Sequence, residues 1–191
     1  STTDILTFSR DYPVHSCAII YQQSGDGDLL YWTDGYNRPR YMNVGTITAL
    51  TGVTEDMINA AKNAPLEPPT CSYADDANVN VNNLRKKLFR FSYRWIYENN
   101  EKSTFSPISK MAFDDSGNNL NTNNDPTKNN NIEVVLTAGG SDSTAIEIVA
   151  QSNVDDTWSD FFSVDTLDLD QYNITPGGTY TYAFYNNGAY P

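Results

Sequence analysis

Histidine and cysteine are scarce in this chain, which has one histidine and two cysteines among its 191 residues. The histidine, His15, is not flanked by the serine and aspartate pattern of a recognised catalytic motif. Ser-His-Asp and Cys-His mechanisms both need a histidine base, and one histidine with two distant cysteines cannot complete a zinc shell without carboxylates. We therefore expect a protein that is not an enzyme, with no catalytic, cofactor-binding or metal-binding residue.

The two cysteines, Cys17 and Cys71, are too few for a disulfide scaffold and too far apart for a C-x-x-C motif. Their separation permits one disulfide but does not require it. Unreactive cysteine behaves as a small apolar residue that is usually buried. The sequence thus predicts two free, mostly buried thiols.

Basic residues are also few: 12 lysines and arginines face 24 acidic residues, which gives a net charge of −12 and an isoelectric point near 4.2. Binding to nucleic acid needs a surplus of positive charge to neutralise phosphates. We therefore expect no tight binding to DNA or RNA. The negative charge either serves solubility alone or repels a nearby DNA backbone.

Long apolar runs are missing, since none approaches the 18 residues of a membrane span, and no signal peptide precedes Thr2. The chain does not begin with methionine, and it ends directly after an aromatic run, at residues 187–191. Such an ending is typical of a cut inside a longer polypeptide. We interpret the chain as a fragment without contact to a membrane.

Aromatic residues are abundant, with 13 Tyr, 8 Phe and 3 Trp. This content favours strands, where large flat side chains cover a pleated surface. Residues 14–21, 29–33 and 40–44 read as the strands of a β-meander, with a hairpin signal at Gly25-Asp26-Gly27. One helix is predicted at about residues 55–62, with Thr54 as its N-cap.

A proline-rich stretch, residues 65–69, must end the helix and reads as an extended linker, because proline restricts its own φ and the residue before it. We place the domain boundary just after it. The predicted domains are residues 1–75, a β-meander that resembles a propeller blade with one short helix, and residues 76–191, a β-sandwich.

Residues 88–97 form the clearest predicted strand, because aromatic residues occupy every second position from Phe89 to Tyr97. After a turn at residues 98–101, residues 103–109 are expected to return as its partner strand. The aromatic face is either core or an exposed platform for sugars. An exposed stripe of five aromatics promotes aggregation, so we predict that Phe91 and Trp95 are buried.

The rest of the chain alternates polar loops with short strands. Residues 114–131 are rich in asparagine and predict an exposed, mobile loop that does not pack. Strands are expected at residues 132–137, 144–151, 157–164 and 179–185, with a loop at 165–175. This spacing predicts a mainly β protein with an antiparallel, fibronectin/immunoglobulin-like sandwich.

Acidic residues are mostly at turns, where aspartate bonds the backbone. Residues 114–119 (DDSGNN) have a weak likeness to a calcium loop, but the D-x-D-x-D-G spacing and its final glutamate are missing. Asn173-Ile174-Thr175 is a glycosylation sequon that matters only in a eukaryotic secreted protein. Neither pattern defines a predicted site.

Residues 30–34 (LYWTD) match the YWTD repeat of receptor β-propellers, but the repeat occurs once, which fits a single blade at most. Extended to Arg40 and with Asn43-Val44, the segment resembles tail proteins of short-tailed bacteriophages, particularly muzzle or nozzle proteins of crAss-like phages. The linker at residues 65–69 lies where that family would have it.

A second stretch has the same likeness. Residues 91–98 (FSYRWIYE) and 102–109 (KSTFSPIS) are similar to hairpins of the form R-Y-x-Y-x-D/E-G-E-x-S-x-W/F-S-P in fibronectin-like modules of phage tail proteins. The departure is Asn99-Asn100, where a glycine usually helps the turn. The resemblance covers about half of the chain in three separate patches.

The resemblance implies a structural protein of the virion tail, in which copies form a ring around the DNA exit channel and contact other tail proteins. An acidic lining would let DNA pass without binding. Two alternatives stay open. One is a secreted bacterial carbohydrate-binding or adhesion sandwich, and the other is an enzyme fragment whose catalytic residues lie elsewhere in the parent.

Overall fold

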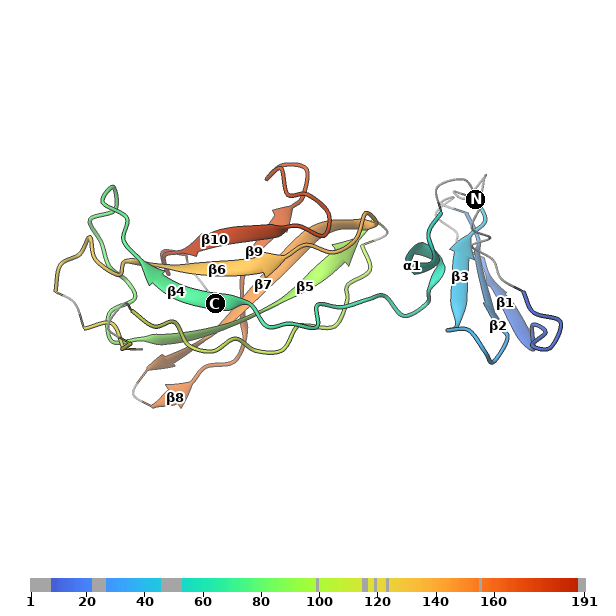
Figure 1. Cartoon of the computed structure of the whole chain (residues 1–191), viewed down its shortest axis with the longest axis horizontal. Coiled ribbons are helices and arrows are strands. Elements are labelled where there is room, and N and C mark those ends of the chain that lie inside the picture. Colours follow the sequence, from blue (N-terminus) through green and yellow to red (C-terminus); the bar gives the residue numbers. More distant parts are fainter. Residues whose placement is uncertain are drawn as a thin grey trace. The chain divides into compact units, whose positions relative to one another are not determined.

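The computed structural model describes residues 8–21, 27–45, 53–98, 100–114, 117–118, 120–122, 124–154 and 156–188 (Figure 1). The chain divides into two compact units, Ser1–Asn63 and Ala64–Pro191. The boundary therefore falls before the proline-rich stretch, earlier than the predicted position after residue 75. The reason is that residues 70–74 pair with a strand of the second unit.

Unit 1 is an antiparallel meander of three strands in the order β1-β2-β3: β1 (Ser16–Ile20), β2 (Leu29–Thr33) and β3 (Arg40–Asn43). The three predicted strands are thus present, each within two residues of its expected bounds. Its buried core is small and consists of Trp32, Val53 and Ile58. Two residues of the predicted hairpin turn, Gly25 and Asp26, lie outside the described residues.

The predicted helix is real but short, because α1 spans only Glu55–Ile58. Thr54 caps it as expected, since its Oγ1 accepts a hydrogen bond from the backbone N–H of Met57 at 3.4 Å. The prediction of helix up to residue 62 is wrong. Asn59 adopts an extended conformation and forms a β-bridge with Arg40, and the N–H of Ala60 donates to the carbonyl of Pro39. Bonds to the sheet therefore replace the next helical turn.

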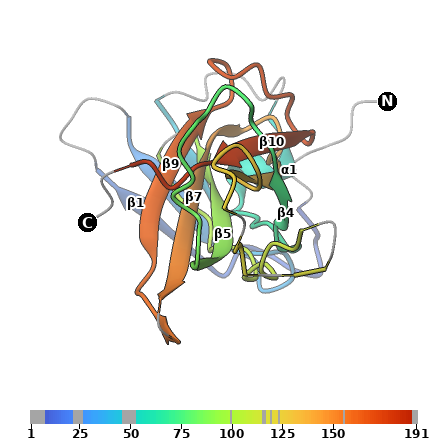
Figure 2. The same ribbon diagram turned by 90° about the vertical axis from the view of Figure 1, so that its left-hand side faces the viewer.

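Unit 2 is an antiparallel β-sandwich, as predicted (Figures 1 and 2). One sheet has the order β10-β6-β4. In the other, β7 pairs with β5 on one side and with β8 and β9 on the other. The strands are β4 (Thr70–Ala74), β5 (Leu88–Tyr97), β6 (Asn131–Thr137), β7 (Ser143–Val154), β8 (Thr157–Trp158), β9 (Phe162–Asp168) and β10 (Thr179–Phe184).

The sandwich core lies between the two sheets. The aromatic face of β5 supplies its largest members, and Phe184 of β10 meets Phe89 and Phe91 edge to face, with ring centroids 5.1 and 5.0 Å apart. The rest of the core is mostly aliphatic and comes from β6, β7 and β9: Ile132, Val134, Leu136, Ile146, Ile148 and Leu167. The period of two in residues 88–97 therefore predicted the buried face of this sheet correctly.

Two strand predictions in unit 2 need correction. The strand expected at residues 157–164 is interrupted, because β8 ends at Trp158 and β9 begins at Phe162. Next to β8, the N–H of Ser152 donates to the hydroxyl of Ser159 at 3.1 Å in place of a backbone carbonyl. The loop expected at residues 165–175 begins later than predicted. Its first residues belong to β9, which pairs with β7 from Ala145 to Ala150 and runs to Asp168.

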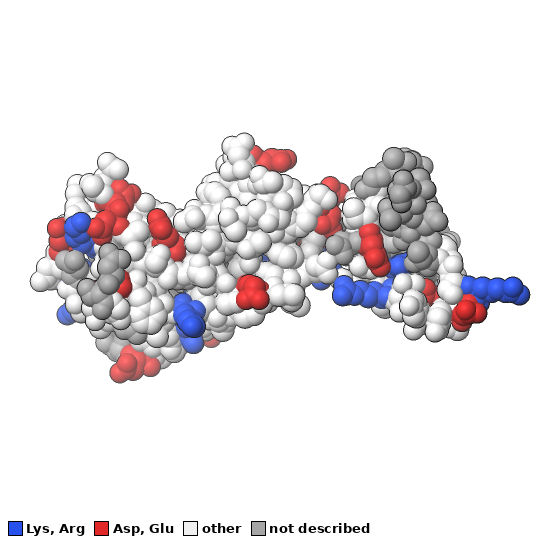
Figure 3. Space-filling model, viewed as in Figure 1, with Lys and Arg blue, Asp and Glu red and all other residues white. Residues whose placement is uncertain are grey.

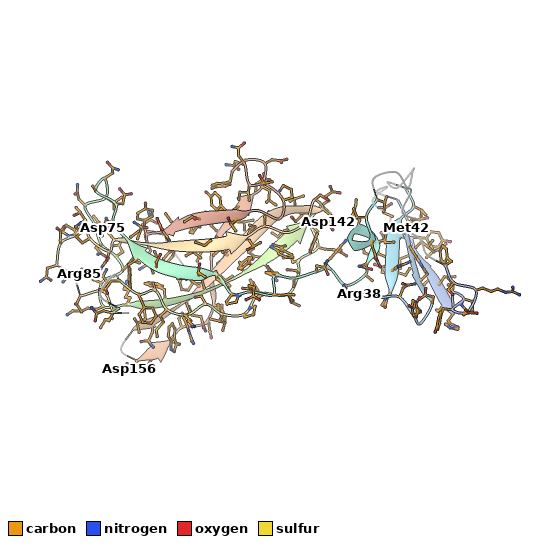
Figure 4. All side chains as sticks on the ribbon, in the orientation of Figure 1. Arg38, Met42, Asp75, Arg85, Asp142 and Asp156 are labelled. Atoms are coloured by element: carbon orange, nitrogen blue, oxygen red, sulfur yellow. The ribbon has the colours of Figure 1, made fainter. Side chains whose placement is uncertain are left out.

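The asparagine-rich loop also differs from its prediction. Among its described residues, Asn121, Asn130 and Asn131 are buried. The amide of Asn130 donates to the carbonyls of Asp76 and Val79, both at 2.8 Å, and its Oδ1 accepts from the N–H of Asp76. The loop thus packs against the segment after β4, at the end of the sandwich marked by Asp75 and Arg85 in Figure 4. Amide side chains satisfy backbone groups that an apolar residue would leave without partners.

Residues 103–109, expected as a partner strand of β5, form no regular strand. Three buried serines attach this segment to β5 at every third residue. The N–H groups of Ser103, Ser106 and Ser109 donate to the carbonyls of Trp95, Tyr93 and Phe91, at 3.0, 2.8 and 2.8 Å. In return, the serine Oγ atoms accept from the N–H groups of the same three residues, at 3.1, 3.2 and 2.9 Å. We call residues 103–109 the serine strap.

Candidate functional site

His15 lies in unit 1, just before β1, and is exposed. Its backbone N–H donates to the carbonyl of Thr33 at 2.9 Å. Within the described residues, no hydrogen bond or ion pair joins its ring to a serine, a cysteine or a carboxylate. The structure therefore places His15 at the margin of the sheet of unit 1.

The two cysteines are both free and lie in different units. Cys71 is half-buried, and burial raises the pKa of its thiol to about 11, although a hydrogen bond with Ser109 acts in the opposite direction. Cys17, in contrast, is exposed. The prediction of mostly buried thiols is wrong for Cys17, because β1 is exposed at each of its residues.

In the weak calcium pattern of residues 114–119, the described carboxylate is engaged within its own loop. The carboxylate of Asp114 accepts hydrogen bonds from the N–H of Asn118 at 2.8 Å and from its side-chain amide at 3.3 Å. Asp115, Ser116 and Asn119 lie outside the described residues. No cluster of three or more metal-binding side chains occurs in the described part of the chain. Asn173 of the sequon is exposed in a turn, with φ +52°.

The aromatic face of β5 is core, apart from one residue. Phe89, Phe91, Tyr93 and Tyr97 are buried, whereas Trp95 is only partly buried. The indole Nε1 of Trp95 donates to the carbonyl of Thr137 at 2.8 Å, so its polar end needs a position at the sheet margin. The prediction that Trp95 is buried is therefore corrected to partial burial, and the buried side chains of this face are not exposed as a platform for sugars.

The surface that stands out is on unit 1. We call residues 14–21 (VHSCAIIY) the β1 strip, because it contains β1 and its immediate neighbours. Its large apolar side chains are exposed: Ile19 at 51%, Ile20 at 53% and Tyr21 at 76%. The strip contains no lysine, arginine, aspartate or glutamate.

The outer edge of β1 also has no partner strand in the part of the chain that the structure describes. Among the described residues, β1 pairs with β2 only. Every second residue of an edge strand directs its N–H and C=O away from the sheet, and these groups form a template for another strand. Protective devices such as proline, a bulge or a charge are missing within β1. The arrangement can therefore accept a further strand by backbone pairing.

In the sandwich, by contrast, a segment of the chain covers one edge of each sheet. The serine strap covers the edge of β5, and the chain then continues to β4, where Phe113 forms a parallel bridge with Ser72. The carbonyl of Phe113 accepts a hydrogen bond from the N–H of Tyr73 at 3.3 Å. Residues 103–113 thus protect one edge of each sheet, and β1 has no counterpart among the described residues.

Acidic side chains are spread over the surface of the sandwich, and basic ones are fewer (Figure 3). Several of the basic groups of unit 2 already have partners. Arg94 Nε and Lys102 Nζ bind the same oxygen of Glu147, at 2.7 and 3.0 Å, and Lys128 binds Asp75 at 2.6 Å. The Arg90 guanidinium stacks on Trp158 at 3.7 Å. The described surface therefore offers few cations for a phosphate backbone.

No family model matches the chain, and the search of curated proteins finds no significant match. No helix of the described residues is long and apolar enough to cross a membrane.

Sequence reasoning missed both the strap and the open edge. The strap had a signal, because Ser103, Ser106 and Ser109 repeat at every third residue. This spacing does not fit the period of two expected of a partner strand. The β1 strip had none, because its uncharged, apolar sequence is equally typical of a strand in a core. Only the structure shows that the strip lies at an edge.

Proposed function

We propose that this chain is a non-catalytic structural module of a bacteriophage virion tail, of the muzzle or nozzle type. In this role it self-associates into a ring, contacts other tail proteins and lies near the DNA exit channel without holding DNA tightly. The proposal starts from the resemblance of three sequence patches and is supported by how two of them are built.

The observation that carries the proposal is that the serine strap is hydrogen-bonded to β5. The two parts of the second patch, residues 91–98 and 102–109, contact each other through six hydrogen bonds that involve three serines. The strap also seals an edge that would otherwise bind other strands. A sandwich with a dense aromatic core and a sealed edge is suited to bearing load in an assembly, and its buried face is not available to ligands.

The first patch, residues 30–40 with Asn43-Val44, forms the β2–β3 hairpin of unit 1. Asp34 is buried, and its carboxylate accepts three hydrogen bonds. One comes from the side-chain amide of Asn37 at 2.6 Å, and the others come from the backbone N–H groups of Tyr36 and Asn37 at 3.0 and 2.7 Å. The side-chain bond from Asn37 contributes most to the lowered pKa of Asp34. The D-G-Y-N part of the patch is therefore the fixed turn of this hairpin, which supports a structural reading of the motif.

Net charge supports the part of the proposal that concerns DNA. A chain with a charge of −12 gains little from the release of counterions. We expect duplex DNA to bind no more tightly than about 10⁻⁴ M at physiological salt, the weak end of non-specific binding. Such a surface repels the DNA backbone as it passes.

The deciding experiment is mass spectrometry of purified virions, which should find this sequence inside a tail protein. Electron microscopy of the full-length parent should show a ring. A DNA titration and a glycan array on the same sample separate the alternatives. Micromolar binding to a glycan, with the sequence missing from virions, would favour the carbohydrate-binding module. Tight DNA binding would contradict only the passive-channel part.

A further inference from the structure

We propose that β1 pairs antiparallel with β1 of a second copy of this chain, so that two three-stranded sheets join into one of six strands. The inference deepens the proposed function, because it names a surface through which copies of the module associate. It rests on three observations on unit 1: an edge of β1 without a partner strand among the described residues, the exposed apolar side chains of the β1 strip, and the absence of charged residues from it.

The outer edge of β1 is suited to binding another β-strand. The backbone groups on the outer side of β1 need partners in a regular row, which an extended chain supplies. The side chains of β1 are exposed on both faces of the sheet. A paired strand would therefore cover Ile19 on one face and Ile20 on the other.

A second copy is favoured by charge. The chain as a whole carries −12, so most surfaces of two copies repel each other. The β1 strip contains no lysine, arginine, aspartate or glutamate, so two strips meet without opposing such charges. In a pair centred on Ala18, Ser16 lies opposite Ile20, and Cys17 lies opposite Ile19.

Size limits the strength of this contact. Two strands of five residues bury much less than the ~1,200 Å² of a standard stable interface. We therefore expect weak, reversible association that becomes firm only where several copies are held together. The pair has two-fold symmetry, which closes a dimer and does not propagate. A ring would need a second, different contact between dimers.

The test is sedimentation velocity of the 191-residue chain over a range of concentrations. We expect a reversible shift from monomer towards dimer as concentration rises. Ile19→Lys places a charge on the edge and should weaken self-association at least tenfold, because two lysines would approach each other. Val44→Lys is the matched control, since Val44 is also an exposed apolar residue of unit 1, beyond β3. This variant should associate like the wild type.

Register is tested by cross-linking. In a Cys17→Ser background, Ala18→Cys puts two thiols opposite each other across the two-fold axis, at a distance that suits a disulfide. Mild oxidation should give a covalent dimer, while Cys17→Ser alone and Cys17→Ser with Val44→Cys should not. Circular dichroism should be unchanged, because Ala18 and Ile19 are exposed.

A wild-type chain that stays monomeric throughout would overturn the proposal, and so would association that Ile19→Lys leaves intact. Association through the other edge of the sheet, at β3, would give as much cross-linking with Val44→Cys as with Ala18→Cys. This result would also refute the proposal. The outcome is independent of the virion experiment. If the chain dimerises but is missing from virions, only the proposed tail function is contradicted. If it is found in virions but stays monomeric, only the β1 pairing is contradicted.

Discussion

Ser106 and Tyr93 exchange two hydrogen bonds of different kinds. The backbone N–H of Ser106 donates to the carbonyl of Tyr93 at 2.8 Å, and the N–H of Tyr93 donates to the hydroxyl oxygen of Ser106 at 3.2 Å. A hydroxyl thus replaces the carbonyl that a neighbouring strand would supply. The edge of β5 is satisfied by a segment that is not itself a strand and cannot extend the sheet.

Replacing Ser106 with alanine should therefore destabilise unit 2. The variant leaves the buried N–H of Tyr93 without an acceptor, which costs about 1–3 kcal/mol. Thr104→Ala is the control, because Thr104 is an exposed residue of the same strap, and it should change the free energy of unfolding by less than about 0.5 kcal/mol. Urea denaturation of both variants measures the difference. Equal stability of the two would mean that water replaces the hydroxyl without cost.

The aromatic face of β5 should show graded sensitivity. Phe91 is fully buried against Phe184, and Phe91→Ala should cost roughly 3–5 kcal/mol. Trp95 is only partly buried and keeps one hydrogen bond, so Trp95→Ala should cost about 1–3 kcal/mol. Thermal and urea unfolding give the order. A larger loss for Trp95→Ala than for Phe91→Ala would contradict the burial described above.

Acid should weaken unit 2 partly through Glu147. Burial raises the pKa of Glu147, but the hydrogen bonds from Arg94 and Lys102 outweigh it and hold the pKa below its ordinary value of 4.5. The folded state then releases the proton more readily than the unfolded state, so this contribution is present above about pH 4.5 and is lost as pH falls through the lower, folded pKa. Glu147→Gln should therefore be less stable at pH 7 and decline less steeply in acid.

The control for the acid experiment is Glu133→Gln, since Glu133 is exposed on β6 and belongs to none of the described ion pairs. Its unfolding curve between pH 7 and pH 3 should follow that of the wild type. Parallel pH dependence in Glu147→Gln and the wild type would show that the two cations do not act on this carboxylate.

Thiol reactivity should separate the two cysteines. Cys17 is exposed and should react at once with an aromatic disulfide reagent at pH 8. Cys71 should react far more slowly, because burial raises its pKa to about 11 and the thiolate is the reactive form. Cys17→Ser should remove the fast phase and leave the slow one. A fast phase that survives in this variant would place Cys71 at the surface.

Sequence patterns predicted the strands best where one periodic face meets a core, as in residues 88–97. They failed where tertiary contacts replace local preference. Asn59 and Ala60 leave the helix because β3 offers them backbone partners. Asn130 is buried because the carbonyls of Asp76 and Val79, far away in the sequence, need its amide. Exposure of β1 had no local signature, since an apolar strand reads the same at an edge and in a core.

The position of β6 also governs when the sandwich can form. β6 is the central strand of its sheet and pairs with β4 from the beginning of the unit and with β10 from its end. As the chain leaves the ribosome, β4 can pair with its neighbour in the sheet only after residue 135 has emerged, and the sheet closes only when β10 follows. The meander of unit 1 has only neighbours in sequence to join and can form long before. Synthesis therefore orders the two units in time, with the slow, long-range closure last.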